Sequence, residues 1–208
     1  MDYNEIKSVA LSYADRQDAE VTTSVDSFLR IVESRINQRV KVGDMVVISQ
    51  LRTQNGVQFY GVPEDFGGIR SISYYPETAS FGKNLEYLNP KQLSDVLLRS
   101  NESDSSKYYA IVAGQLQIVP PPANGILDIS YYRKIPPLTA SNSENWLSKA
   151  HPELYIFGVM VEISAFVKDK EATQLWEARF TSEIDNLEMN DELTRWSGTP
   201  LRIRSEEF

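Results

Sequence analysis

The stretch LYIFGVMVEISAFV, residues 154–167, decides the fold, because nearly every one of its side chains is apolar. Pro152 lies just before it, and proline is favoured in the first turn of a helix. A helix that is apolar on most sides must be covered by other elements. Its length of about 14 residues, interrupted by Glu162 and Ser164, is short of the roughly 20 apolar residues that span a bilayer. We therefore predict a buried central helix and no membrane partner.

Three amphipathic segments are available to cover this helix. Residues 2–5 have the Asp-x-x-Glu spacing of a capping box, and apolar residues follow at helical intervals as far as Tyr13. A second helix is predicted to open at Ser24 and to end at Gly43 as its C-cap glycine. The third is the final helix, from about residue 172 to residue 187. An amphipathic hairpin cannot bury its own apolar face, so the first and last parts of the chain must pack together.

Between these helical parts the apolar period changes to two, which predicts an inserted β-region. Ala113-Gly114 suits a tight hairpin, and Asn89-Pro90 suits the start of one short helix inside the region. The predicted strands cover residues 45–53, 58–62, 69–75, 107–111, 115–119 and 126–133.

The predicted fold class is α+β. Residues 1–44 and 138–196 form a helical bundle, residues 45–137 form an inserted antiparallel β-subdomain, and residues 197–208 form an extended C-terminal arm. Hydrophobic residues make up 41% of the 208 and charged residues 24%, as in ordinary globular proteins, so a disordered chain is excluded.

Composition also excludes several kinds of function. The chain has no Cys, which removes disulfides, thiolate nucleophiles, zinc fingers and iron–sulfur sites, and its one His removes most His-based catalysis. The formal net charge of −8 does not suit a protein that grips phosphates, so tightly bound nucleic acid is not expected. No phosphate-binding glycine motif is present. We expect no cofactor and no metal.

Carboxylates and the single His are the remaining catalytic candidates. Glu64-Asp65 and Glu162 are the only carboxylates that suggest an acid–base pair, as a peptidoglycan-cleaving enzyme would need. Glu64-Asp65 follows Pro63 in a predicted exposed turn, and His151 has no nucleophile motif near it. The favoured interpretation is structural for all of them, and no catalytic residue is assigned.

Subunit contact is the role predicted for three residues. Glu162 is a charge in an otherwise apolar helix, so it should meet an arginine, a hydroxyl group or a subunit boundary. Adjacent residues of a strand point to opposite faces, so one Tyr of each Tyr-Tyr pair faces away from the core. We name Glu162, Tyr75 and Tyr132 as interface candidates. A carbohydrate- or receptor-binding β-module is the alternative interpretation of the aromatic strands.

The last residues have the alternation of a strand with no turn to fold it back. Pro200 stops any helix, and Leu201 and Ile203 would share one face while Arg202 and Arg204 share the other. With Phe208 at the end, this arrangement suits strand addition to another protein. We predict a partner-binding arm, and the alternative is a tail that packs on its own subunit.

Three segments of the chain follow a familiar order. YGVPEDF (60–66) combines an aromatic residue, an apolar-Pro pair and an Asp-aromatic turn. YYAI (108–111) through LQIVPPP (116–122) and YYRKIPPL (131–138) form a central β-region. NWL (145–147) and HPELY (151–155) open a final pair of helices. In this order and spacing the chain resembles the head-to-tail adaptor (connector) proteins of tailed bacteriophages.

The resemblance implies a structural protein of the virion neck, assembled in the host cytoplasm. Such adaptors form a ring, usually of twelve copies, beneath the portal protein after DNA packaging. The ring extends the DNA channel and gives tail, nozzle or fibre proteins a platform, so genomic DNA would meet it only in passage. A net negative charge agrees with this role, because a channel through which DNA slides should repel phosphate. The arm would then bind the portal.

Overall fold

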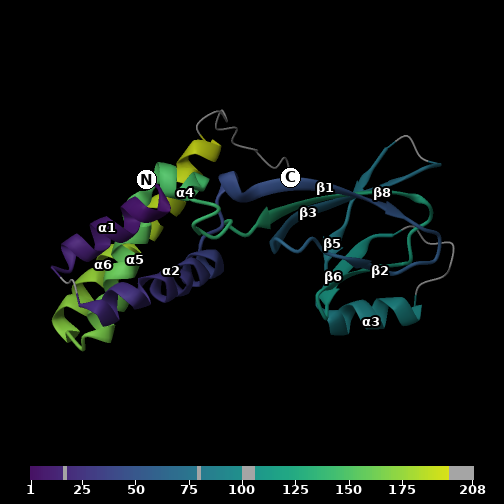
Figure 1. Cartoon of the computed structure of the whole chain (residues 1–208). Coiled ribbons are helices and arrows are strands. Elements are labelled where there is room, and N and C mark those ends of the chain that lie inside the picture. Colours follow the sequence, from purple (N-terminus) through teal and green to yellow (C-terminus); the bar gives the residue numbers. More distant parts are fainter. Residues whose placement is uncertain (16–17, 79–80, 100–105, 197–208) are drawn as a thin grey trace, which may run out of the picture. The chain divides into compact units, whose positions relative to one another are not determined.

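The computed structural model describes residues 1–15, 18–78, 81–99 and 106–196. The chain divides into two compact units (Figure 1). The helical unit consists of Met1–Asp44 together with the chain from Ile135 onward, and the β unit is Met45–Lys134. The predicted α+β class is confirmed. No helix among the described residues combines the length and the hydropathy needed to cross a membrane.

The helical unit is built around α5, as the apolar stretch predicts. α1, α2 and α6 all pack against α5, and the short α4 leads into it (Figure 1). Leu154, Val159 and Ile163 of α5 are almost fully buried. The helices of this unit are α1 (Tyr3–Tyr13), α2 (Ala19–Arg39), α4 (Trp146–Ala150), α5 (Pro152–Phe166) and α6 (Lys170–Trp196).

The capping box at the N-terminus is confirmed. The Asp2 carboxylate accepts the Glu5 N–H at 2.8 Å, and the Glu5 carboxylate accepts the Asp2 N–H at 2.8 Å. A similar device starts α4, where the Asn145 side chain accepts the Ser148 N–H at 2.8 Å. Pro152 stands at the start of α5, as predicted.

Both predicted ends of the second helix are wrong. α2 begins at Ala19, because the Ser24 hydroxyl does not cap a helix but donates to the Glu20 carbonyl one turn earlier, at 2.8 Å. α2 ends at Arg39, since Val40 already has an extended backbone with ψ 128°. Gly43 instead starts a 3-10 turn, Gly43–Met45, and its N–H donates to the Asp191 carboxylate at 2.7 Å.

The β unit contains two four-stranded sheets. Their strand orders are β1-β8-β3-β4 and β2-β7-β6-β5. All pairings are antiparallel except that of β5 with β6, which are joined through α3 (Pro90–Arg99) and run parallel. The strands are β1 (Val46–Thr53), β2 (Phe59–Gly61), β3 (Phe66–Pro76), β4 (Lys83–Asn84), β5 (Glu86–Tyr87), β6 (Tyr108–Val112), β7 (Gln115–Val119) and β8 (Gly125–Arg133).

Local turn chemistry explains two features of this unit that the sequence predicts. Ala113 and Gly114 both have positive φ, 50° and 74°, and join β6 to β7 as a tight hairpin. The Asn89 side chain accepts the Gln92 N–H at 2.9 Å, which caps α3 as expected.

The two sheets share one core and differ in what covers their other faces. Ile72, Leu127 and Ile129 from one sheet meet Leu116 and Ile118 from the other in a single cluster. On its far side, the β2-β7-β6-β5 sheet is covered by α3, whose Leu93 packs with Ala110 and Val119 (Figure 1). Within the described residues, the β unit supplies no such layer for the far side of β1-β8-β3-β4.

Candidate functional site

The uncovered side of the β1-β8-β3-β4 sheet, here named the outer sheet face, is the main candidate for protein contact. Strand register places its residues in rows across the sheet, since Ser130 lies opposite both Ile48 and Ser71. The outer sheet face consists of Ile48, Gln50, Arg52, Ser71, Ser73, Tyr75, Ile126, Asp128, Ser130 and Tyr132.

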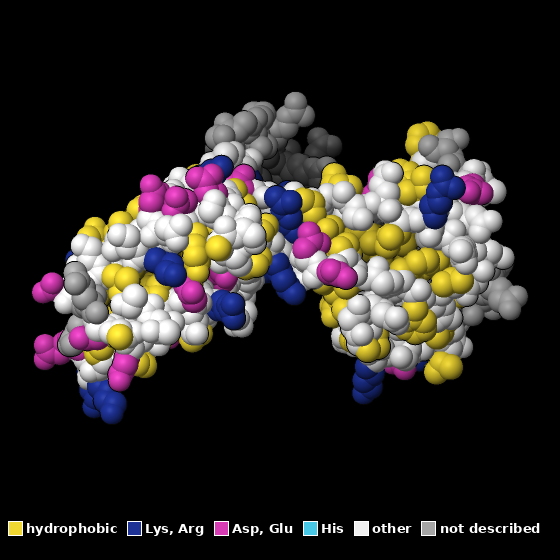
Figure 2. All heavy atoms as spheres, in the orientation of Figure 1, with side chains coloured by type: hydrophobic (Ala, Val, Ile, Leu, Met, Phe, Trp, Pro, Cys, Tyr) yellow, Lys and Arg dark blue, Asp and Glu magenta, His cyan; other side chains and the backbone are white. Residues whose placement is uncertain are grey.

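Large apolar side chains are exposed on this face. Ile48 is 71% exposed, Tyr75 43% and Ile126 39%. Tyr75 and Ile126 lie opposite each other, next to Arg52 on the other side of β8. β-branched and aromatic side chains are typical of the packed centre of a contact between proteins when they gather on one face. Figure 2 shows hydrophobic side chains across much of the visible side of the β unit.

A polar row crosses the middle of the outer sheet face. Gln50, Asp128 and Ser73 lie opposite one another, and the Ser73 hydroxyl donates to the Asn84 side chain at 2.7 Å. One Asp128 carboxylate oxygen is buried and has no hydrogen-bond partner among the described residues. A buried polar atom without a partner costs free energy, so this oxygen lowers the stability of the β unit.

The structure puts two of the three interface candidates on this face. Tyr75 and Tyr132 both belong to it, whereas their neighbours Tyr74 and Tyr131 lie in the core. Tyr75 is opposite Ile126, six residues along β8 from Tyr132, so the two tyrosines are roughly 20 Å apart along the strand. They are therefore separate contact points on one surface and cannot together stack on one small ligand.

The third interface candidate, Glu162, has the arginine partner that its position requires. Arg35 of α2 lies between two carboxylates, with its Nη1 3.4 Å from Glu162 Oε1 and its Nη2 2.5 Å from Glu177 Oε1. Hydrogen bonding to Glu177 raises the pKa of Arg35. This ion-pair group joins α2, α5 and α6 within the helical unit.

The carboxylates considered for catalysis have structural partners or are exposed to solvent. The Asp65 carboxylate accepts the Tyr131 hydroxyl at 2.9 Å, and the Asp65 carbonyl accepts the Lys134 N–H at 2.6 Å. Burial first, and this hydrogen bond second, raise the pKa of Tyr131. Glu64 is exposed at the neighbouring position. Asp65 thus fastens the turn before β3 to the end of β8.

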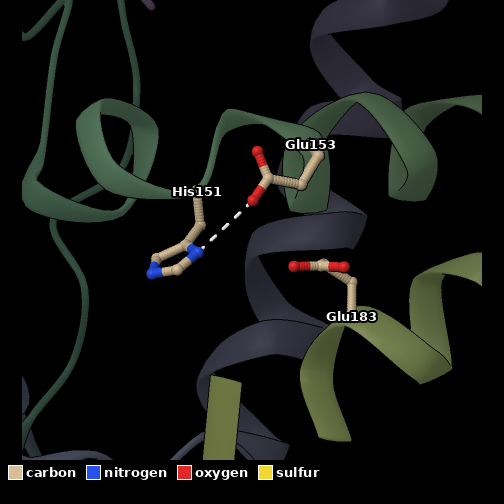
Figure 3. Close-up of side chains that lie close together, drawn as sticks. All are labelled: His151, Glu153 and Glu183. Carbon is tan, nitrogen blue, oxygen red and sulfur yellow. Dashed lines mark hydrogen bonds and ion pairs between the residues drawn. The ribbon is translucent and has the colours of Figure 1, made fainter. Parts of the chain in front are cut away.

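The single His belongs to a side-chain group that sequence patterns did not indicate. His151 lies between α4 and α5, and its Nδ1 is 3.3 Å from Glu153 Oε1. Glu183 of α6 brings its carboxylate to the same place (Figure 3), and the ligand atoms of the three residues all lie within 4.8 Å of one another. Only the packing of α6 on α5 brings Glu183 there.

Charge is divided unequally between the two units. Met45–Lys134 contains eight Asp and Glu and eight Lys and Arg, so the formal charge of the β unit is zero. The rest of the chain contains 21 acidic and 13 basic residues, so it carries the whole net charge of −8. Any electrostatic effect of the net charge therefore belongs to the helical unit and the C-terminal residues.

The sequence analysis did not identify Ile48 and Ile126 as surface residues, because both are apolar and belong to strands that also supply the core. A signal was present, since Gln50 and Arg52 follow Ile48 at intervals of two, and Asp128 and Ser130 follow Ile126 in the same way. The predicted partner-binding arm is not placed by the structure. Leu201, Arg202, Ile203, Arg204 and Phe208 all lie outside the described residues.

A comparison with protein-family models identifies the family. The family model described as SU10 adaptor protein matches residues 1–204, nearly the whole chain. A search of curated proteins finds no match.

Proposed function

Because this chain belongs to the SU10 adaptor protein family, and is therefore a structural phage adaptor, we propose that it forms the ring beneath the portal in a phage neck. In this role copies of the chain, twelve in the simplest match to the portal, extend the DNA channel and give the tail components a platform. The chain acts by binding proteins and carries out no reaction.

The outer sheet face is the observation that carries this proposal. It exposes Ile48, Tyr75 and Ile126 on a regular sheet. A neighbouring copy that covers this face would bury the apolar side chains, which is favourable at about 25 cal/mol per Å² of apolar area. We assign the outer sheet face to the contact between ring copies.

The charge division supports a second part of the proposal, in which the acidic helical unit contributes the surface that DNA passes. Like charge on the channel wall would repel phosphate and let the genome slide. The neutral β unit would then serve protein contacts, where strong net charge gives no benefit.

A pair of matched variants tests the assignment of the outer sheet face. Ile48→Asp puts a charge in the proposed contact, whereas Leu98→Asp makes the same change at an 85% exposed leucine of α3, on the other side of the β unit. We expect both variants to fold, with only Ile48→Asp failing to form rings on purified portal. Equal ring formation by the two variants would show that this face is not the contact between copies.

The two alternatives from the sequence make different predictions in the same preparation. A carbohydrate- or receptor-binding module would remain a monomer or trimer and would not bind portal. A peptidoglycan-cleaving enzyme would lyse cell walls and lose that activity in Glu64→Gln or Glu162→Gln. For an adaptor, we expect no lytic activity from the wild type or from either variant. The two variants should differ from wild type only in stability or assembly.

A further inference from the structure

We propose that His151, Glu153 and Glu183 form a binding site for one divalent transition-metal ion, with Zn²⁺ as its test ligand. This inference is independent of the adaptor function. The site lies within the helical unit, at the corner between α4 and α5, where α6 passes (Figure 3).

The distances suit a metal ion. Two ligands bound tetrahedrally at about 2.1 Å are about 3.4 Å apart. His151 Nδ1 and Glu153 Oε1 already lie 3.3 Å apart. The Glu183 oxygen is within 4.8 Å of both, so a small side-chain rotation brings it into the first coordination sphere. Solvent reaches the half-buried group, which leaves a position for water as a fourth ligand.

The charge of the group favours a cation. Two carboxylates approach each other here from different helices, and like charges at such distances repel. Among the described residues, the side chain of Glu183 has no ion pair or hydrogen bond, and the only such contact of the Glu153 side chain is with the imidazole of His151. Arg35, Arg39 and Lys149 pair with other carboxylates. A bound divalent ion would neutralise both carboxylates at once.

The ligand types select the kind of metal. One imidazole nitrogen with carboxylate oxygens suits Zn²⁺ and its neighbours in the first transition row, whereas Mg²⁺ and Ca²⁺ prefer oxygen ligands only. The backbone of His151 is held in place, because its backbone N–H donates to the Leu147 carbonyl at 2.7 Å and Pro152 follows directly. The bound ion would fasten the α4–α5 corner to α6.

The composition makes the site unusually easy to test. The chain has one His and no Cys, so in the untagged protein any metal-bound imidazole belongs to His151 and no thiolate competes. We would treat the full chain with a chelator and titrate it with Zn²⁺. Calorimetry gives the affinity and stoichiometry, and the imidazole ¹⁵N signals of His151 report ligation directly.

We expect one Zn²⁺ per chain, a shift of the His151 Nδ1 signal, and a melting temperature raised by about 5 to 10 °C at about 100 times Kd. Glu153→Gln and Glu183→Gln should each weaken binding at least tenfold. Glu171→Gln, at an exposed carboxylate of the same helix α6, is the control and should bind as wild type does. Circular dichroism checks that each variant is folded.

Three results would overturn the proposal, two with Zn²⁺ and one with Mg²⁺. One is an unchanged His151 signal at saturating Zn²⁺, and the other is Zn²⁺ binding by Glu183→Gln as tight as that of wild type. An equal response to Mg²⁺ would also contradict it, since that would show a diffuse attraction between the acidic helical unit and any divalent cation.

Discussion

At the scale of single residues, two side chains of α2 bind the backbone of the segment that follows the β unit and returns to the helical unit. The Glu33 carboxylate accepts the Leu138 N–H at 2.6 Å, and the Asn37 side chain accepts the Ile135 N–H at 2.7 Å. Glu33 is only 7% exposed, and burial raises its pKa, while the Leu138 hydrogen bond and the charge of Arg30 act in the opposite direction. A buried carboxylate therefore serves as a backbone acceptor.

The raised pKa of Glu33 predicts a pH-dependent stability. From about pH 4.5, the ordinary value, up to the folded-state pKa, the native chain keeps a proton that the unfolded chain has released. The free energy of unfolding therefore falls as pH rises through this window and stays lower above it. Glu33→Gln removes the ionisation and keeps an oxygen for Leu138. We expect its stability relative to wild type to be greater at pH 7 than at pH 4.

Denaturant unfolding of both proteins at the two pH values measures this difference. Glu64→Gln, at an exposed carboxylate, is the control and should show little change of relative stability with pH. If the free energies of unfolding of Glu33→Gln and wild type differ by the same amount at pH 4 and at pH 7, the raised pKa of Glu33 does not make the stability depend on pH.

Residue roles were predictable only where the cause is local. The caps at Asp2 and Asn89 depend on neighbours three residues away, so the sequence displays them. Glu33 stands among the polar residues of its helix, yet its partner Leu138 is 105 residues further along the chain. Glu183 is similar, since only the packing of α6 on α5 brings it to His151. No local pattern contains such information.

At the scale of elements, Gly158 of α5 lies where side chains of α2 and α6 pack against α5. A Cβ atom added at Gly158 of α5 would collide with Val32 of α2 and lie 3.1 Å from Phe180 of α6. Gly158→Ala should therefore lower the stability by roughly 1–3 kcal/mol, as overpacking of a core does. The added cost should be smaller when Val32→Ala is also present, because the collision is then relieved.

Thermal and denaturant unfolding of the single and double variants measure this coupling. Gly61→Ala is the matched control, because nothing lies within 4 Å of a Cβ at that glycine and its stability should hardly change. Independent, additive effects of Gly158→Ala and Val32→Ala would contradict the predicted close approach of α2 and α5.

The C-terminal residues give a prediction that depends on sequence alone. If residues 198–208 are an arm that binds portal by strand addition, truncation after Ser197 should weaken binding to purified portal while the bundle stays folded. Many arms on one ring act together, so the loss should be far larger for rings than for single chains. The full-length double variant Leu201→Ser, Ile203→Ser should share the defect. Undiminished binding by the truncated chain would show that these residues do not bind the portal.

Elements were predictable where one strong periodicity or turn motif decides them, and less so elsewhere. The apolar run of α5 and the Ala113-Gly114 hairpin were both identified correctly. The start of α2 was missed because Thr22, Thr23 and Ser24 resemble caps but bond back to carbonyls within the helix. The parallel pairing of β5 was missed because each strand of that pair contributes only two residues to it.

At the scale of the whole molecule, the division into two units predicts that the helical unit folds alone. Its core includes Ile6, Val32, Val159 and Ile184, all from helices of that unit. Replacing Met45–Lys134 by a short flexible linker should leave a cooperative helical unfolding transition and abolish ring formation, because the outer sheet face is removed. Loss of the helical circular dichroism signal would show instead that the helices need the β unit to fold.

The architecture was predictable from the change of period along the chain. The uncovered sheet face and the different charges of the two units were not. The apolar period distinguishes helical segments from β segments. In the structure the helical segments form one unit and the β segments form the other. Which sheet face stays uncovered depends on where α3 packs, and the sequence shows α3 only as a helix. The net charge of the β unit can be counted only when the boundaries of the unit are known, and the structure supplies them.

The most direct test of the central claim, that this structural adaptor forms a ring on the portal, is the mass of the complex formed when the purified chain is mixed with portal rings. We expect one discrete species, heavier than the portal by a whole ring of chains, twelve for a twelve-fold portal. This species should be missing with Ile48→Asp and should form with Leu98→Asp. A mixture that retains only the masses of free portal and free chain would show that the chain does not form a ring on the portal.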